Sequence, residues 1–429
     1  MLRHFLKPYR GLPREIYVIF FSRMINAAGL FIFPLFTLIL TSKIGLSASE
    51  AGIWLTLMGI VIVPANLLGG KLTDWVGRKP MILLGQTIGG ILFMICGFLE
   101  PGMTQIYLIL SACFFFGLSD PANLSIIADL TTKDQREAAY ALSYMGFNLG
   151  FAIGPTIGGL LFNNFYAWIF WGDALTLFVS VALVQVFIKE TYLKTRIDSE
   201  AISFPQIDQK TAESAEPAGD AMEAAVSGSV LKVLLQRPIL LVFSSILLFY
   251  NFSYAQWHYL LPIQLEDLFP LKGASTFGLL ASLNGLVVLI CTPLLTSGLR
   301  QYPALRRVAL GGLLYLIGFG TFAFAESRLL FALGCVIFTL GEITITISYM
   351  PYVANRTPVS HRGRMNAVLP LLMGVGYTAG PIVMSRGLLI FAPQTGWLLI
   401  SVLLVFAVVS MLVLERYDAR VGIREAGEL

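Results

Sequence analysis

The sequence predicts an all-α integral membrane protein, built from twelve transmembrane helices in two six-helix halves. Of the 429 residues, 56% are hydrophobic and 13% are charged, whereas soluble domains carry about 25% charged residues. The apolar residues form runs of about twenty, which is the length that crosses a bilayer as a helix. One long polar stretch divides these runs into two sets of six.

The twelve runs set the order of the expected helices. They lie at residues 16–42, 51–70, 81–99, 105–130, 138–162, 167–189, 238–262, 274–298, 306–325, 329–354, 365–391 and 396–414. If the N-terminus is cytoplasmic, 24 of the 29 Lys and Arg residues lie on the inner side and four on or near the outer side. Since cytoplasmic loops retain positive charge, we predict a multi-pass protein of the cell membrane with both termini cytoplasmic.

The halves are expected at residues 1–190 and 238–429, the latter ending in a short cytoplasmic tail, and they are joined by a cytoplasmic linker at 191–237. The linker is rich in Ala, Glu, Ser and Asp, which offer little to pack. A shift of 226 residues places Arg136, Gly150, Gly154 and Pro155 on residues of the same type. This repeat favours two pseudo-symmetric bundles related by an axis along the membrane normal.

Several functions are disfavoured by what the sequence contains. The four cysteines lie in apolar runs without CxxC spacing and are expected to be lipid-buried thiols: Cys96, Cys113, Cys291 and Cys335. We find no pattern for a metal cluster, a catalytic triad or a phosphate-binding loop. We therefore expect no enzyme activity, no metal, no cofactor and no nucleic-acid partner.

The stretch GGKLTDWVGRKP at 69–80 interrupts two apolar runs. Gly69 and Gly70 are expected to allow close helix approach, and Gly77 a tight reversal. Asp74 is expected near the start of the next helix, where a carboxylate is favoured. Arg78 and Lys79 are expected on the cytoplasmic side.

The segment from Gly70 to Pro80 resembles the loop signature of the major facilitator superfamily, and the resemblance covers essentially the whole chain. It implies a conformational latch that braces the outward-open state. Its residues would be Gly70, Asp74, Gly77, Arg78, Lys79, Asp129 and Arg136, with Arg136 completing a charge chain through Asp129. The alternative is a positive-inside loop without a gating role. In the second half, LLTSGLRQYPALRR places Arg300 or Gln301 near the aspartate position, so the signature is intact in one half only.

A second motif lies in the fifth span, where glycines at four-residue spacing should form a smooth stripe and a proline should bend the helix. Its residues are Gly150, Gly154, Pro155, Gly158 and Gly159. The motif resembles that of drug–proton antiporters of the family, which implies export; ordinary helix packing is the alternative. Those antiporters usually carry an arginine in span 4, at the position that Cys113 occupies here. Proton transfer by that arginine's usual route is therefore in doubt. Span 1 offers Arg23 as another basic residue.

Ionisable residues at membrane depth are costly and usually functional. Arg23 and Asp120 are expected at similar depths, either as a structural pair or as coupling or substrate residues. Glu342 has no basic residue near it in sequence, and its LGE segment resembles the antiporters' span 10, where a glutamate serves protons and cationic drugs. His258, with an ordinary pKa of about 6.5, could take part in transport or simply be hydrogen-bonded. Asp173 is expected to accept a structural hydrogen bond.

A substrate cavity is expected to include Asn26, Tyr250, Asn251 and Tyr254, with aromatic rings suited to lipophilic cations. Trp257 and Tyr259 instead favour an aromatic belt at the outer membrane surface. The main hypothesis is a monomeric, proton-coupled exporter of lipophilic or cationic small molecules, working by alternating access in the bilayer. The alternatives are a symporter or uniporter of a metabolite or sugar, a lipid or glycolipid flippase, and, least favoured, a sensor or scaffold.

Overall fold

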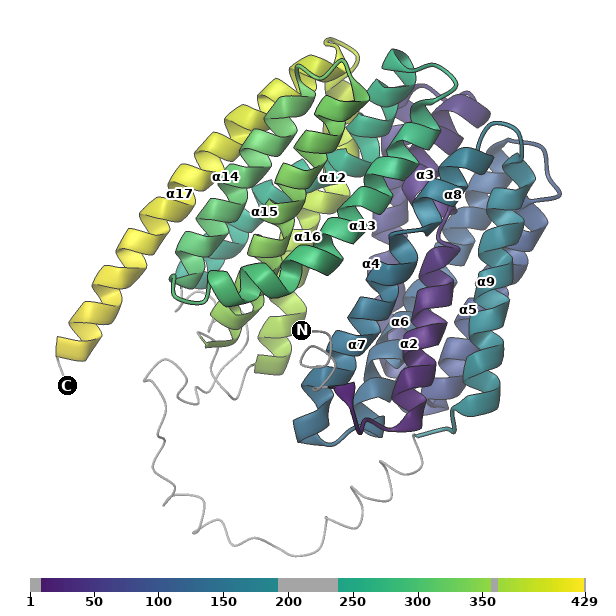
Figure 1. The fold of residues 1–429 in the computed structure, drawn as a ribbon, viewed down its shortest axis with the longest axis horizontal. Coiled ribbons are helices and arrows are strands. Elements are labelled where there is room, and N and C mark those ends of the chain that lie inside the picture. The colour runs from purple at the N-terminus through teal and green to yellow at the C-terminus, as the bar shows by residue number, and fades with distance from the viewer. Residues whose placement is uncertain (1–8, 192–237, 356–361, 428–429) are drawn as a thin grey trace, which may run out of the picture. The chain divides into compact units, whose positions relative to one another are not determined.

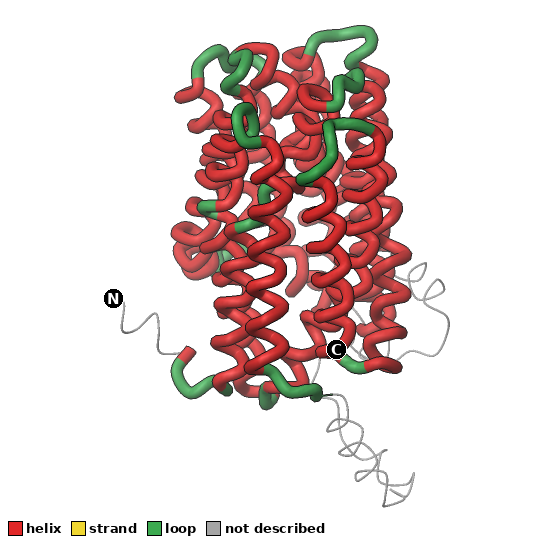
Figure 2. The backbone as a smooth tube through the Cα atoms, turned by 90° about the vertical axis from the view of Figure 1, so that its right-hand side faces the viewer, coloured by secondary structure: helices red, strands yellow, loops and turns green. Residues whose placement is uncertain are grey.

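The computed structural model describes residues 9–191, 238–355 and 362–427, and every regular element in these ranges is a helix (Figure 2). This agrees with the physical constraint of a bilayer, in which a spanning segment must satisfy its backbone hydrogen bonds internally. The predicted linker at 191–237 lies outside the described residues, apart from Thr191.

The helices of the first half are labelled in Figure 1. They are α2 (Arg14–Ala28), α3 (Ile32–Leu38) with a π-helical turn (Ile39–Lys43), α4 (Ala48–Val76), α5 (Arg78–Cys96), α6 (Met103–Leu130), α7 (Lys133–Phe151), α8 (Gly154–Leu161) and α9 (Tyr166–Phe187). Spans 1 and 5 are each interrupted, so that α2 with α3, and α7 with α8, each make up one span. The interruptions matter for the site below.

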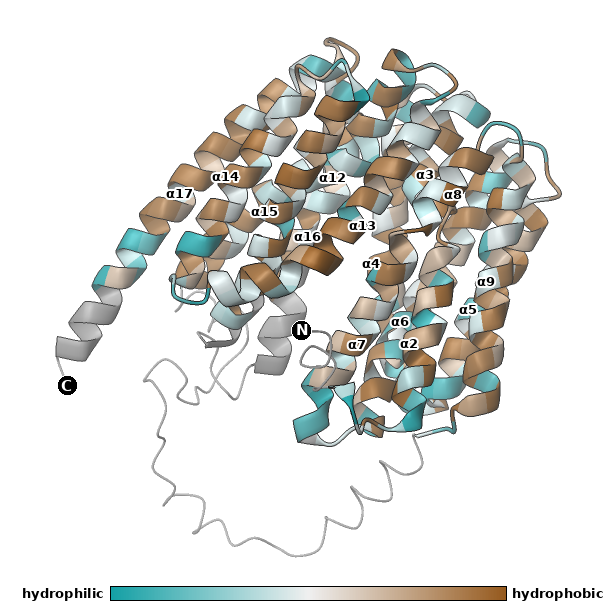
Figure 3. Ribbon diagram, viewed as in Figure 1, coloured by the Kyte–Doolittle hydropathy of each residue, from teal (hydrophilic) through white to brown (hydrophobic). Residues whose placement is uncertain are grey.

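The described residues of the second half, 238–355 and 362–427, form six helices. They are α12 (Pro238–Leu268), α13 (Gly273–Gly298), α14 (Ala304–Phe322), α15 (Arg328–Asn355), α16 (Arg362–Gly387) and α17 (Pro393–Gly427). Counted as spans, the described helices number twelve, as predicted, and ten are long and apolar enough to cross a membrane. In the first half, hydrophilic residues gather toward the lower ends of α2, α7 and α9, and the helix middles are mostly apolar (Figure 3).

By its contacts the chain divides into two compact units. The first unit is Met1–Ile207 with Leu265–Leu289, and the second unit is Asp208–Gln264 with Ile290–Leu429. This division assigns the first part of α13 to the first unit, whereas the domain boundaries at 190 and 238 remain a prediction.

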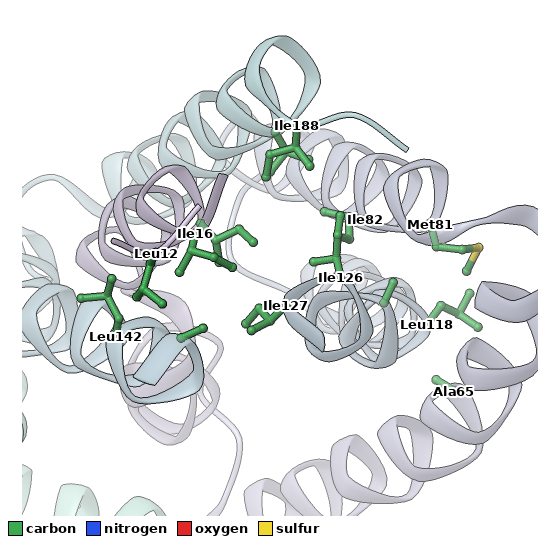
Figure 4. Packing of buried hydrophobic residues seen from close by; sticks show 14 residues of the cluster. Leu12, Ile16, Ala65, Met81, Ile82, Leu118, Ile126, Ile127, Leu142 and Ile188 are labelled. Atoms are coloured by element: carbon green, nitrogen blue, oxygen red, sulfur yellow. The ribbon is translucent and has the colours of Figure 1, made fainter. Parts of the chain in front are cut away.

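The core of the first unit is a cluster of branched aliphatic side chains that converge from several helices (Figure 4). Ile16 of α2, Ile82 of α5, Ile126 and Ile127 of α6, and Ile188 just after α9 are each at most 2% exposed. This packing fixes α2, α6 and α9 relative to one another, and α2 and α6 carry the charged residues Arg23 and Asp120.

Candidate functional site

The first unit contains a partly open cavity of about 350 Å³. The polar side chains from α2 and α6 that line it include Arg23, Asn26, Asp120 and Asn123. Asn26, predicted as a substrate-cavity residue, lines this cavity, and its contact with a substrate stays a prediction. Most of the remaining wall is apolar, with phenylalanines from α3, α5, α6 and α7.

Arg23 and Asp120 face the same cavity, and their opposite charges attract each other. Within the described part of the chain, however, neither side chain makes an ion pair of 4.0 Å or less, and neither makes a side-chain hydrogen bond. Asp120 is exposed even though it lies in the middle of α6, because its carboxylate reaches the open space of the cavity. The direct structural pair considered for these residues is absent from this structure.

A small polar network joins three helices at the side of the same cavity. The Ser22 and Ser180 hydroxyls lie 2.6 Å apart, and Ser180 donates to Gln86 Oε1 at 3.3 Å. All three residues are buried and line the cavity. Hydrogen bonding of this kind holds α2, α5 and α9 in a fixed relation, because a buried hydroxyl without a partner is costly.

The helix of span 1 is interrupted beside the cavity. A Cβ atom at Gly29 would lie 1.8 Å from Thr176 Oγ1, so only glycine allows α9 to approach so closely here. The backbone N–H of Ile32, at the start of α3, donates to Asp173 Oδ2 at 3.5 Å. The structural role predicted for Asp173 is confirmed, and its carboxylate satisfies backbone groups that the interruption leaves without helical partners.

The second unit contains an open cavity of about 270 Å³. Its lining includes the predicted residues Tyr250, Asn251, Tyr254 and Glu342. The Tyr254 hydroxyl donates to Glu342 Oε1 at 3.0 Å. Tyr315 and Tyr349 complete a wall of tyrosines around the carboxylate.

The rings of this second cavity are packed against one another. Tyr254 stacks on Tyr315 with ring centroids 6.2 Å apart, and Tyr377 lies 6.3 Å away. His258 contacts Tyr254 and Tyr377, so it lies one helical turn beyond the cavity lining and supports it. The arrangement presents aromatic rings and one carboxylate to the same space, which is suited to an organic cation.

The interfacial belt expected for Trp257 and Tyr259 is wrong. Both side chains are at most 1% exposed, and Trp257 packs on Phe338 with a centroid distance of 4.5 Å. The sequence places these residues near the end of a span, but Trp257 faces Phe338 of α15, whereas Tyr259, on another side of α12, is hydrogen-bonded to Ser385 of α16.

The predicted latch contains a buried ion pair. Arg78 Nε donates to Asp129 Oδ2 at 2.8 Å, and the two side chains are 11% and 12% exposed. Asp74, by contrast, is 75% exposed and lies 3.5 Å from Arg78. Lys79 Nζ donates to the carbonyl of Gln185. The expected pairing of Arg78 with Asp129 is therefore present, and Asp74 contributes from the surface.

Three expectations about the latch need correction. Asp74 lies in the last turn of α4 instead of at the start of α5, and Arg136 donates to the carbonyl of Ala128 instead of pairing with Asp129. Gly69 permits close approach, since a Cβ there would lie 2.3 Å from Leu118 O. A Cβ at Gly70 would meet no atom within 4 Å, because the next residue along a helix points to another side.

Glu190 is the carboxylate that sequence reasoning missed. Its two oxygens accept hydrogen bonds from the backbone N–H groups of Arg78 and Lys79 at 3.1 and 2.9 Å. It thus caps α5, the role expected of Asp74, since carboxylates are favoured at helix N-termini. Gly77 allows this approach: its φ is +109°, and a Cβ would lie 2.9 Å from the Glu190 carboxylate. Thr191 Oγ1 donates to Asp129 at 2.9 Å.

The glycine motif of span 5 packs mainly against span 1 of the same half. A Cβ at Gly150 would lie 2.2 Å from Met24 O, and one at Gly154 would lie 2.7 Å from Ala27 O. In the second half, a Cβ at Gly376, the repeat partner of Gly150, would lie 2.0 Å from Leu248 O of α12. The two repeats therefore use the same close approach.

The expected bend at Pro155 is an interruption. Helix α7 ends at Phe151 and α8 begins at Gly154, because proline supplies no N–H to continue the ladder. Gly158 faces Phe31 and Leu35, while Gly159 approaches the backbone of Ala274 in α13. Close packing thus accounts for the motif's spacing.

In the second half the loop that corresponds to the latch uses other partners. Arg306, at the start of α14, pairs with Glu415 of α17 at 2.9 Å. Among the described residues, no group of three or more His, Cys, Asp or Glu side chains is placed to hold a metal ion. The chemically distinctive groups are thus the charged residues of the two cavities and the latch.

Comparison with known sequences extends over most of the chain. The family described as Major Facilitator Superfamily matches residues 19–381. An Na(+), Li(+), K(+)/H(+) antiporter of Planococcus maritimus is 23% identical over 396 residues, with 87% of each chain covered. Multidrug resistance protein MdtH of Edwardsiella ictaluri is 24% identical over 398 residues, with 90% of each covered.

Solved structures agree on the fold. A crystal structure of a peptide transporter, POT, has a TM-score of 0.74 at 17% identity and covers 96% of each chain. The nucleoside transporter NupG has a TM-score of 0.74 at 13% identity, covering 94% of this chain and all of its own. The chain therefore belongs to the major facilitator superfamily, a family of secondary transporters and not of enzymes.

Proposed function

We propose that this transporter is a proton-coupled exporter of lipophilic small molecules that carry a positive charge, working by alternating access. The observation that carries the proposal is Glu342, which lines the second cavity together with a wall of tyrosines and accepts a hydrogen bond from Tyr254. A carboxylate at such a place can hold either a proton or an organic cation. Exchange of one for the other is the chemistry of antiport.

The relatives lend support of a general kind. One is named an antiporter that exchanges alkali cations for protons, and another a multidrug resistance protein. The first name makes sodium a second candidate for the cation. We further propose that the protein acts as a monomer in the cell membrane with both termini cytoplasmic, as the distribution of Lys and Arg indicates.

The buried ion pair of the latch would stabilise one conformation of the transporter. Glu190 would fix the start of α5, which carries Arg78. Protonation of Glu342, with Asp120, Arg23 and His258 as further participants, would shift the balance between inward- and outward-open states, because a neutral carboxyl tolerates occlusion better than a charged one.

The test is transport by purified protein in liposomes with an imposed pH gradient. The panel contains ethidium, sodium and a neutral sugar. Ethidium uptake into liposomes with an acidic lumen, abolished when the gradient is collapsed, is the expected result. Gradient-driven uptake of sodium alone would assign the second candidate, and sugar transport without a proton requirement would refute the proposal.

A further inference from the structure

The charges of the first cavity are of both signs, in contrast to those of the second. We propose that the first cavity binds amphiphilic zwitterions, with Arg23 holding a carboxylate and Asp120 an ammonium group on one lipophilic ligand. This inference rests on the proposed export of charged lipophiles and adds zwitterions to the ligands that the transporter binds.

Arg23 and Asp120 attract each other electrostatically, but in the part of the chain that the structure describes neither is in direct contact with a charged or hydrogen-bonding partner. Within the described residues, Arg23 and Asp120 make neither an ion pair with each other nor side-chain hydrogen bonds with other groups. Arg23 is partly buried and Asp120 is exposed, so both charged groups are open to a ligand that enters the cavity. Because both line one cavity, a ligand that carries the two opposite charges would satisfy both at once.

A ligand of a single charge fits this pair of residues less well than a zwitterion does. A plain cation at Asp120 would also lie near Arg23, whose like charge opposes it. A plain anion at Arg23 would meet the same opposition from Asp120. A carboxylate and an amine on one ligand avoid both repulsions, and a guanidinium binds a carboxylate through two parallel hydrogen bonds.

The remainder of the cavity wall carries phenylalanines. Phe33, Phe36, Phe93, Phe116 and Phe147 line the cavity and offer an apolar surface to an aromatic body. A volume of about 350 Å³ lies within the range of small-molecule sites. Asn26 and Asn123 stand on the same helices as the two charged residues and can orient polar groups of the ligand.

The test uses two fluorescent probes that differ in one group. Nε-dansyl-lysine carries an α-amine and a carboxylate, and dansylcadaverine is the same molecule without the carboxylate. Dansyl fluorescence is titrated on the detergent-purified full chain without any gradient. The wild-type protein should bind dansyl-lysine about tenfold or more tightly than dansylcadaverine, because the hydrogen bonds to a charged group are worth that much.

Arg23→Gln should abolish this preference, so that the two probes bind with equal affinity. Arg23→Lys should keep part of it, since a charge remains without the forked donors. Lys43→Gln is the matched control, because Lys43 belongs to the first unit but does not line the cavity; it should keep the full preference.

Equal binding of the two probes by the wild-type protein would overturn the inference, and that measurement stands even where a variant fails to fold. A preference that persists in Arg23→Gln would also overturn it. The readout is separate from the proposed function: a loss of gradient-driven transport of every substrate would refute export, whereas the probe preference is measured at equilibrium.

Discussion

The ion pair between Arg78 and Asp129 should stabilise the folded protein far more than the contact between Arg78 and Asp74. The first joins side chains 11% and 12% exposed at 2.8 Å, and the second reaches a carboxylate that is 75% exposed. Breaking a buried pair costs about 3–5 kcal/mol, whereas an exposed pair is worth about 0–1 kcal/mol. Thr191 also donates to Asp129, so this carboxylate would keep one partner in the Arg78→Ala variant. We therefore expect Arg78→Ala to lower the free energy of unfolding by about 3 kcal/mol, the lower end of this range.

The assay is unfolding by SDS in mixed micelles, followed with a thiol-reactive fluorophore. Cys96 and Cys335 are buried and should react only on unfolding. Asp74→Asn should lower the unfolding free energy by less than about 1 kcal/mol. A double-mutant cycle between Arg78→Ala and Asp129→Asn should give a coupling energy well above that of the cycle with Asp74→Asn. Equal couplings for the two aspartates would refute the reasoning.

Two further predictions concern packing and the interrupted helix. Gly150→Ala would place a Cβ 2.2 Å from Met24 O and should destabilise the fold by about 1–3 kcal/mol in the same unfolding assay. Gly70→Ala, whose Cβ meets no atom within 4 Å, is its control and should be neutral or stabilising; equal losses would contradict the packing account. Asp173→Ala removes the buried acceptor of the Ile32 N–H and should cost about 1–3 kcal/mol, and a loss below about 0.5 kcal/mol would show that the interruption does not depend on this carboxylate.

The sequence predicted the helices well because span length and apolarity are local properties. Every predicted run corresponds to a described helix or to an interrupted pair of helices. The interruption at Gly29–Phe31 was missed although Pro34 lies in the first turn of α3. Prolines also lie inside continuous helices of this chain, at Pro64 and Pro121, and the contacts at the break, from Thr176 and Asp173, come from another helix. At Pro155 the sequence predicted a bent helix, whereas in the structure the helix is interrupted between Phe151 and Gly154.

The candidate site could be predicted only where a residue type is rare in its surroundings. Arg23, Asp120 and Glu342 are conspicuous because each is a charge in an apolar run, and each was found to line a cavity. Glu190 was missed because it follows a span, where charges are common, and its partners lie 112 and 111 residues away. The difference between Gly69 and Gly70 depends on helix phase, which composition does not determine.

The central claim is that Glu342 exchanges protons for substrate, and one substitution tests it most directly. Glu342→Gln keeps the shape and can still bond to Tyr254, but it cannot release a proton. The measurement is ethidium uptake into liposomes with an acidic lumen, with Glu326→Gln as the control because Glu326 is an exposed carboxylate ahead of α15. The account predicts that gradient-driven uptake is lost in Glu342→Gln and kept in Glu326→Gln. Unchanged gradient-driven uptake by Glu342→Gln would contradict it.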